Sequence, residues 1–443
     1  MASNGVKKSS LKKLHYFRDL RIKTLQHAEG IPMKEVQLEV PLLRAVVEDI
    51  ERTIQCVEGD LPFIVSCWAN APEVCAAMDI NWLSIGYAHV GVDYDAFIQD
   101  LERGDQMAIP ADVCTVNRQI IRSIEEGEVP IPTACVALLE PCDGLTLAHN
   151  VAMRHKDWAN VPFFAPDPPY VETDPRTMPY FAEELKRMTR FLEKHLGKRL
   201  DLDRLREIIE ESNKQVQMFI EFNDLKRAVP CPVPSFAGAS ILSAATSVPA
   251  MVGLPMGTDY IRAKLAHAEE MVKAKKGAVP NEKIRVYWLD LPPAWGLMGL
   301  GMWLAQEWGA NVVQDFISDC PLTLIDASTE DSMFQGLAKR DMVDNSMVRQ
   351  SRGRVNLMLD DLVRIVKDFK IDCVIHARHM GHKDHSANVG LVRDKCRELG
   401  VPVLHFALDI LDPRYTPLEE VKKEISQFFM AMGLGERQAP ESP

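Results

Sequence analysis

The sequence predicts an α/β protein built from two doubly wound parallel-sheet domains, of the Rossmann or flavodoxin type, with a helical segment between them. Short apolar runs alternate with amphipathic runs in two separate stretches, residues 61–170 and 283–443. Strands that alternate with helices are typical of βαβ units, in which the strands are parallel. Residues 171–282 carry long amphipathic patterns without strand-like runs, which predicts helices alone. A chain of 443 residues is long enough for two or three domains.

The N-terminal segment, residues 1–60, is expected to be helical, because apolar positions recur at helical spacing from residue 10 to residue 57. The first α/β domain is expected at residues 61–170. Its elements are predicted in this order: strand 61–69, helix 71–81, strand 82–90, helix 92–104, helix 111–128, strand 133–141, helix 143–158 and strand 161–169.

The helical segment at 171–282 is expected to end in a linker at 275–283, where lysine, glycine and proline gather. The second α/β domain then occupies residues 283–443. Its elements are predicted in this order: strand 283–290, helix 294–308, strand 311–317, helix 351–369, strand 371–377, helix 386–400, strand 402–410 and helix 416–433.

The composition describes an ordinary globular protein and excludes several partners. A net charge of −12 argues against a nucleic-acid partner and against an anionic membrane surface. No apolar run is long enough to cross a bilayer, and the basic N-terminus lacks a signal-peptide core, so we expect a cytoplasmic protein. The ten cysteines include no CxxC pair, so a cluster or metal site would draw its ligands from distant segments.

Ligands of open parallel sheets bind beyond the carboxyl ends of the strands. Four loops hold these positions in the predicted arrangement. They are the loop at Cys142, the loop from Asp290 to Gly301, the loop from His379 to His385, and the loop from Asp412 to Tyr415.

Four of the twelve histidines stand at every third position of one short run, at His376, His379, His382 and His385. Neutral imidazole is the commonest metal ligand and titrates near physiological pH, so the run is a candidate for metal or proton chemistry. A three-residue spacing drifts round a helix by about 60° per step, so the four cannot share one helical face. Two or three of them can converge if the run is a loop; otherwise they are buried core histidines.

Two cysteines stand at predicted helix starts. Cys142 follows a strand directly and precedes a helix, and Cys114 begins a helix that Asp112 can cap. A helix N-terminus stabilises negative charge and therefore favours a thiolate, as a ligand or a nucleophile. The alternative for each is a small buried residue of the core.

Three further features are weaker. Gly296, Gly299 and Gly301 resemble a phosphate-binding loop but do not form GxGxxG, and close helix packing explains them as well. Arg414 follows a strand end and can clamp a phosphate or carboxylate, or form a surface salt bridge. Cys231 lies in a proline-rich turn from which it can approach a ligand.

Over residues 60–435 the sequence resembles the large subunits of the 2-hydroxyacyl-CoA dehydratases and of the related ATP-dependent benzoyl-CoA reductases. The matching features occur in the family's order along the chain. They are the helix start at 112–114, the Cys-Asp pair at 142–143, the segment 154–164 leading to 168–170, the helical middle, the strand end at 374–376 and the sequence LDPRY at 411–415.

The resemblance implies two α/β domains with a helical region, and an oxygen-sensitive [4Fe-4S] cluster held by three cysteines from separate segments. Cys114 and Cys142 match the first two. The third family cysteine lies in a loop written His-Trp-Gly-Cys-Lys, often with a serine shortly after. Here residues 379–383 read HMGHK, and Ser386 follows. His382 therefore occupies the place of the third cysteine.

The resemblance also implies a CoA thioester as substrate, a paralogous second subunit and an ATP-dependent activator protein that supplies one electron. This electron makes a ketyl radical that loses the 2-hydroxyl, or it reduces an aromatic ring. In this scheme Cys114, Cys142 and His382 hold the cluster. His379 and Ser386 act as acid or hydrogen-bond donor beside the substrate.

Histidine for cysteine leaves three hypotheses open, because an imidazole ligand raises the reduction potential of a cluster relative to thiolate. The chain is a catalytic subunit with an altered cluster that has His382 as a ligand. Alternatively, it is a non-catalytic paralogous subunit that lacks the cluster. In the third hypothesis it is a mononuclear metal enzyme that uses the run from His376 to His385, with imidazole, carboxylate and water as ligands of zinc or iron(II).

Overall fold

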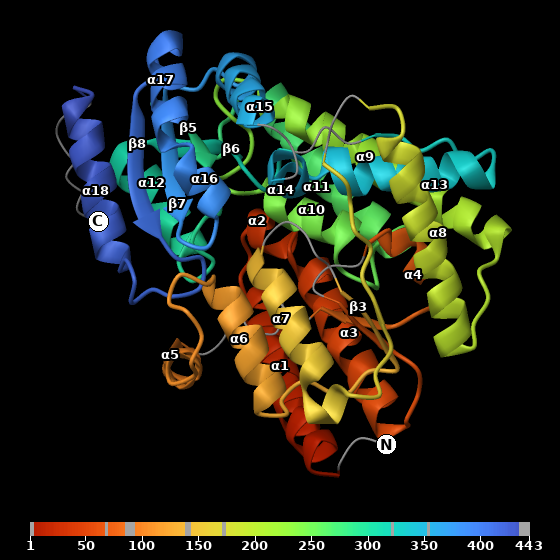
Figure 1. Ribbon diagram of the computed structural model, residues 1–443. Coiled ribbons are helices and arrows are strands. Elements are labelled where there is room, and N and C mark those ends of the chain that lie inside the picture. The colour runs from red at the N-terminus through yellow and green to blue at the C-terminus, as the bar shows by residue number, and fades with distance from the viewer. Residues whose placement is uncertain are drawn as a thin grey trace. The chain divides into compact units, whose positions relative to one another are not determined.

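The computed structural model describes residues 4–66, 70–84, 94–137, 143–170, 174–319, 323–351 and 355–433, without the side chains of residues 4 and 94–96. Contacts divide the chain into two compact units (Figure 1). The first unit comprises Met1–Ile220, Ser240–Lys264 and Pro321–Gly353, and the second comprises Glu221–Ala239, Leu265–Cys320 and Arg354–Pro443. Each unit contains one four-stranded parallel sheet, which confirms the predicted α/β fold class.

The sheet of the first unit is short and buried. Its strands are β1 (Ile64–Ser66), β2 (Trp82–Ser84), β3 (Ala134–Val136) and β4 (Phe163–Phe164), and they are hydrogen-bonded in the order β2-β1-β3-β4. Alternate residues of β1 face opposite cores. Ile64 packs with residues of one hydrophobic cluster and Val65 with those of another, so both faces of the sheet are covered.

Helices from both ends of the unit's sequence build these two cores. Leu185 of α8 and Leu337 of α13 belong to the cluster that contains Ile64. Leu14 of α1 and Ile120 of α6 belong to the cluster that contains Val65. The helices of this unit are α1 (Asn4–Glu29), α2 (Lys34–Gln37), α3 (Val40–Glu58), α4 (Pro72–Ala77), α5 (Tyr94–Asp105), α6 (Thr115–Glu125), α7 (Asp143–Arg154), η2 (Lys156–Trp158), α8 (Thr177–Leu196), α13 (Glu330–Lys339), η3 (Arg340–Asp344) and α14 (Ser346–Ser351).

The predicted helical segment forms α8, α9 (Leu202–Leu225), α10 (Gly238–Thr246) and α11 (Pro255–Lys273). The unit boundaries fall within α9, α10 and α11 in sequence, so this segment is shared between the two units. The division into 1–60, 61–170, 171–282 and 283–443 stays a prediction. The sequence analysis assigned no element between 330 and 351, where the structure has α13, η3 and α14.

The second unit repeats the strand order of the first with longer strands. These are β5 (Ile284–Leu289), β6 (Ala310–Asp315), β7 (Cys373–His379) and β8 (Val403–Leu408), all parallel, in the order β6-β5-β7-β8. Leu304 of α12 and Phe429 of α18 pack with Trp288 in one core, while α15 and α17 contact each other. The helices are α12 (Leu297–Trp308), α15 (Val355–Asp368), α16 (Lys383–Ala387), α17 (Val389–Leu399) and α18 (Leu418–Ala431).

This strand order is that of flavodoxin-like sheets, and it locates the site of interest. The chain moves outward in one direction from β5 to β6 and then in the opposite direction through β7 to β8. The neighbouring strands β5 and β7 therefore flank the topological switch point, beyond which ligands of doubly wound sheets bind. Within the described ranges, no helix is both long and apolar enough to span a membrane.

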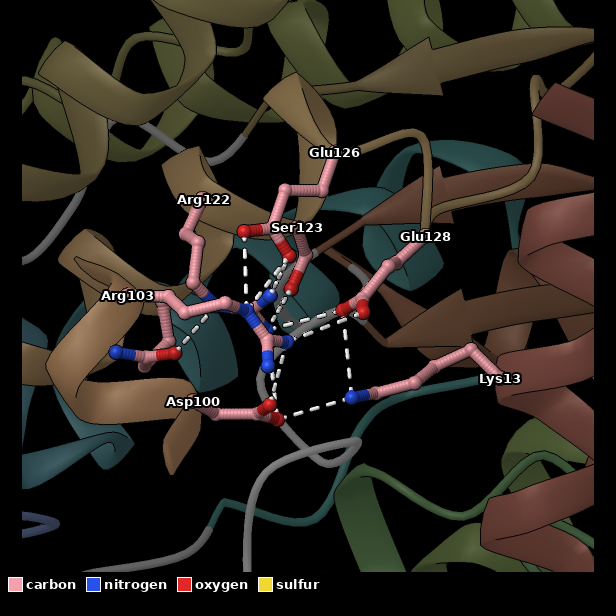
Figure 2. A network of polar contacts seen from close by, with 8 residues as sticks. Lys13, Asp100, Arg103, Arg122, Ser123, Glu126 and Glu128 are labelled. Carbon is pink, nitrogen blue, oxygen red and sulfur yellow. Dashed lines mark hydrogen bonds and ion pairs between the residues drawn. The ribbon is translucent and has the colours of Figure 1, made fainter. Parts of the chain in front are cut away.

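A buried network of charges joins three helices of the first unit (Figure 2). Arg122 of α6 is fully buried and lies 3.0 Å from Glu128 and 3.5 Å from Asp100 of α5. Lys13 of α1 lies 2.9 Å from Asp100 and 3.4 Å from Glu128. Arg122 also bonds to Glu126. The network thus connects α1, α5 and α6 through side chains of opposite charge.

Burial alone would raise the pKa of Asp100, but the hydrogen bond from Lys13 and the nearby positive charges bring this pKa below its ordinary value. The carboxylate therefore stays ionised inside the network. Removing one partner of such a buried group leaves an uncompensated charge, which is far more costly than the loss of an exposed ion pair.

We expect the substitution Arg122→Met to lower the free energy of unfolding by about 3 kcal/mol, because it removes the fully buried cation that three carboxylates share. Arg103→Met is the matched control. Arg103 contacts the same carboxylates, but its side chain is 41% exposed. Its loss should cost less than about 1 kcal/mol in urea-induced unfolding. Equal losses for the two variants would contradict the role given to burial.

Candidate functional site

The site is organised by Asp290, the first residue after β5. Its backbone has φ of 78°, in the left-handed region that aspartate tolerates better than most residues. The carboxylate is fully buried, and both of its oxygens accept backbone hydrogen bonds. Oδ1 accepts from Leu291 N–H at 2.7 Å, and Oδ2 accepts from His379 N–H at 2.9 Å. The position of the carboxylate is therefore fixed by the chain itself.

Two histidines of the run converge on this carboxylate. His382 Nδ1 lies 2.7 Å from Asp290 Oδ1, and His385 Nδ1 lies 3.8 Å from the same oxygen. His382 directly precedes the short helix α16 and His385 lies within it, which brings both rings to one side. The three residues offer ligand atoms within 4.8 Å of one another, and all three are buried.

The electrostatics of the site are those of one ion pair and one neutral ring. Burial would raise the pKa of Asp290, but His382 and His385 lower it well below the ordinary range. Burial would lower the pKa of His382, but Asp290 raises it above the ordinary value. Burial lowers the pKa of His385 and outweighs the pull of Asp290. In the absence of another cation, His382 is thus the proton-bearing partner of Asp290.

His385 is the least satisfied of the four histidines. Neither of its ring nitrogens has a hydrogen-bond partner among the residues that the structure describes, although the side chain is 2% exposed. Its ring packs edge-on against Phe316 at a centroid distance of 4.7 Å. A buried polar atom without a hydrogen-bond partner destabilises the folded state by about 1–3 kcal/mol. Two such atoms in one ring therefore indicate that a ligand binds there.

The other two histidines of the run lie in β7 rather than in the loop after it. His379 Nδ1 lies 3.2 Å from the backbone nitrogen of Ile410. The His379 ring also bonds to the backbone of Leu408, and burial lowers the pKa of His379 to about 4. His376 contacts His405 across the β7–β8 pair, with the two Nδ1 atoms 3.1 Å apart. His376 thus belongs to a separate histidine pair that the sequence analysis did not anticipate.

The remaining predicted residues of this unit occupy ordinary positions. Ser386 is half-buried on α16, and its N–H donates to the His382 carbonyl at 3.0 Å. The Arg414 guanidinium donates two hydrogen bonds to the Asp412 carboxylate, as in the salt-bridge interpretation. Gly301 follows the packing interpretation, since a Cβ there would lie 3.2 Å from Ser235. The Cys231 thiol is buried, which raises its pKa to about 11.

The cysteine positions belong to the first unit. Cys114 is the residue before α6, as predicted, and it is 8% exposed. Cys142 lies outside the described residues, but α7 begins directly after it. The first turns of α6 and α7 adjoin, because a Cβ on Gly144 would come within 2.7 Å of Asn117 and 3.6 Å of Val113. The structure therefore brings two helix starts together, each preceded by a predicted thiol ligand.

The sequence did not predict that Asp290 contacts His382 and His385. The signal was present but weak. Asp290 ends a strand-like run and opens one of the four loops singled out above, and an aspartate at such a place is common in any α/β protein.

Comparison with known proteins identifies one family. The profile of the family described as 2-hydroxyglutaryl-CoA dehydratase, D-component, matches residues 67–431, which is most of the chain. No curated protein matches the chain at a significant level.

We expect Asp290→Asn to lower the free energy of unfolding of the metal-free protein by about 2 kcal/mol near pH 5.5. The lowered pKa of Asp290 gives stability above about pH 4 that is lost on acidification. The raised pKa of His382 gives stability below about pH 6.5 that is lost as pH rises through its folded value. The difference between wild type and variant should therefore shrink on both sides of this window.

Asp360→Asn is the control for this prediction, because Asp360 is exposed on α15 and its charge is not among those that shift the pKa of His382 or His385. Its effect should stay within about 0.5 kcal/mol at every pH. Urea unfolding in the presence of a chelator measures both variants. A wild-type advantage over Asp290→Asn that does not vary with pH would contradict the ion pair.

Proposed function

The chain belongs to the 2-hydroxyglutaryl-CoA dehydratase D-component family, and we propose that it is the cluster-free subunit of an acyl-CoA dehydratase. Family membership makes it a component of a dehydratase-type lyase. The proposal adds that a paralogous subunit carries the [4Fe-4S] cluster and receives electrons from an ATP-dependent activator. The observation that carries it is the buried contact of 2.7 Å between His382 and Asp290.

The donors of this chain do not fit a cluster held by three thiolates. Cys114 and Cys142 match two of the expected positions, but the third position holds an imidazole, His382, and not a thiol. The thiols of the described core are no substitutes. Burial raises the pKa of Cys75 to about 12 and raises that of Cys135 still further, so these thiols remain protonated.

The chemistry of the third position supports the same conclusion. An imidazole ligand raises the reduction potential of an iron–sulfur centre, which opposes one-electron reduction of a thioester. The buried carboxylate beside His382 favours a cationic partner at this position. We therefore assign no step of the reaction to a cluster in this chain.

The proposed role of this chain is to complete the acyl-CoA site that the family's two-subunit enzymes require. His379 and Ser386 are proposed as hydrogen-bond donors near the substrate. The support for His379 is its position at the end of β7, where its ring centroid lies 5.0 Å from that of His382. The family description names a dehydratase, so we propose dehydration of a 2-hydroxyacyl thioester rather than ring reduction.

The proposal predicts the iron content of the complex. The chain, purified anaerobically with its paralogous subunit, should contain about four irons per heterodimer, one cluster and not two. Cys142→Ser in this chain should leave iron, sulfide and turnover unchanged. Serine at the third cluster cysteine of the paralogous subunit should abolish both iron binding and turnover.

Two outcomes would contradict the proposal. About eight irons per heterodimer would mean that this chain holds a cluster of its own. Loss of turnover on Cys142→Ser would assign the chain to the catalytic hypothesis, in which His382 is a ligand of an altered cluster. Electron paramagnetic resonance of the reduced complex distinguishes one cluster species from two.

A further inference from the structure

We propose that Asp290, His382 and His385 bind one divalent transition-metal ion, zinc or iron(II), at the switch point of the second sheet. This inference rests on the proposed function in one respect only. It gives a role to His382, which occupies the position of the family's third cluster ligand. Metal binding itself is measurable on the full chain without any turnover.

The spacing of the donors suits a first-row divalent ion. Zinc binds imidazole nitrogen at about 2.0–2.1 Å and carboxylate oxygen at about 2.0–2.2 Å, so neighbouring ligand atoms of a tetrahedron lie about 3.4 Å apart. Around Asp290 Oδ1 the observed separations are 2.7 Å to His382 Nδ1 and 3.8 Å to His385 Nδ1. One separation is shorter and the other longer than this value, so binding of an ion requires the two rings to move relative to the carboxylate.

The kind of donor is equally suited to such an ion. Two imidazoles and one carboxylate are the protein ligands of many catalytic zinc sites and of mononuclear iron(II) sites. Calcium and magnesium prefer all-oxygen surroundings, so this set selects against them. Three protein ligands leave at least one coordination position for water or for an oxygen atom of a bound molecule.

The unsatisfied ring of His385 is an independent observation that points to a ligand. It is buried, both nitrogens lack hydrogen-bond partners in the described part of the chain, and Nδ1 faces the carboxylate at 3.8 Å. His376 and His405 satisfy one nitrogen each through their mutual contact, which His385 does not. A metal ion would supply the missing partner and would offset the cost of this burial.

Residues around the three proposed ligands restrict the orientation of their side chains. Backbone N–H groups of Leu291 and His379 hold the two oxygens of Asp290. Phe316 packs against the rings of both His382 and His385, at centroid distances of 6.5 and 4.7 Å. Hydrogen bonds to the ligating carboxylate and an apolar wall beside the imidazoles restrict the motion of all three side chains.

The test is a titration of the chelator-treated full chain with Zn²⁺, followed by calorimetry and by the melting temperature. We expect one equivalent to bind and to raise the melting temperature. Replacement of Zn²⁺ by Co²⁺ should give the visible absorption of a four-coordinate or five-coordinate nitrogen–oxygen site. His385→Phe should weaken zinc binding by about 100-fold or more, because it removes a ligand and not merely an outer partner.

The same variant distinguishes a metal ligand from a structural histidine. His385→Phe should fold and should be at least as stable as the metal-free wild type, because it removes two unsatisfied nitrogens. His405→Gln is the matched control, since it changes a neighbouring histidine pair on β8 outside the proposed ligand set. It should keep wild-type zinc affinity and the Co²⁺ spectrum.

Absence of stoichiometric Zn²⁺ binding by wild type, or undiminished binding by His385→Phe, would overturn the metal site. Neither result would touch the proposed cluster-free role, which depends on iron and sulfide content in the heterodimer. Conversely, a second iron–sulfur cluster in the heterodimer would overturn that role. Zinc binding by the isolated chain would still decide the metal site separately.

Discussion

The constraint on which the second unit depends is a buried carboxylate at the end of a central strand. A charge taken out of water is tolerated only when it is paired and hydrogen-bonded. Asp290 meets both conditions through two backbone N–H groups and His382. Because one of those N–H groups belongs to β7, the carboxylate also connects the ends of the two strands that flank the switch point. The site thus stabilises this edge of the sheet.

The sheets themselves follow from apolar patterning, which is why the fold class could be predicted. Strands of a doubly wound sheet are covered on both faces, so runs such as 284–289 are mostly apolar, with Arg285 as the one charged residue, and stand out from the amphipathic helices. The eight strands that the structure describes were all expected near their observed positions. Helix α13, which lies at 330–339, was not assigned, because its ten residues give only a short periodic pattern. Its Phe334 and Leu337 nevertheless pack into a core of the first unit.

The histidine run shows where sequence reasoning reached its limit. The spacing excluded a shared helical face, and the structure indeed divides the run between a strand and a short helix. It could not show that β7 extends to His379, which places His376 against His405 and leaves the rings of His382 and His385 to form the donor group with Asp290. That division depends on the register of β7 with β8, a long-range pairing that no local pattern encodes. Asp290 lies 92 residues from His382 in sequence, so the decisive contact was equally hidden.

The exchange of cysteine for histidine at 382 is consistent with its surroundings. A thiolate at this position would lie beside a buried carboxylate, and two anions in contact raise each other's pKa and oppose ionisation. An imidazole in the same place is stabilised by Asp290 as a cation or as the ligand of one. Asp290 and His382 therefore suit each other in a way that Asp290 and a cluster thiolate would not. His385 extends the same logic, since its Nδ1 lies 3.8 Å from the same carboxylate oxygen. Asp290, His382 and His385 thus form one donor set for a divalent cation. The histidine that replaces the family's cysteine is one member of that set rather than an isolated change.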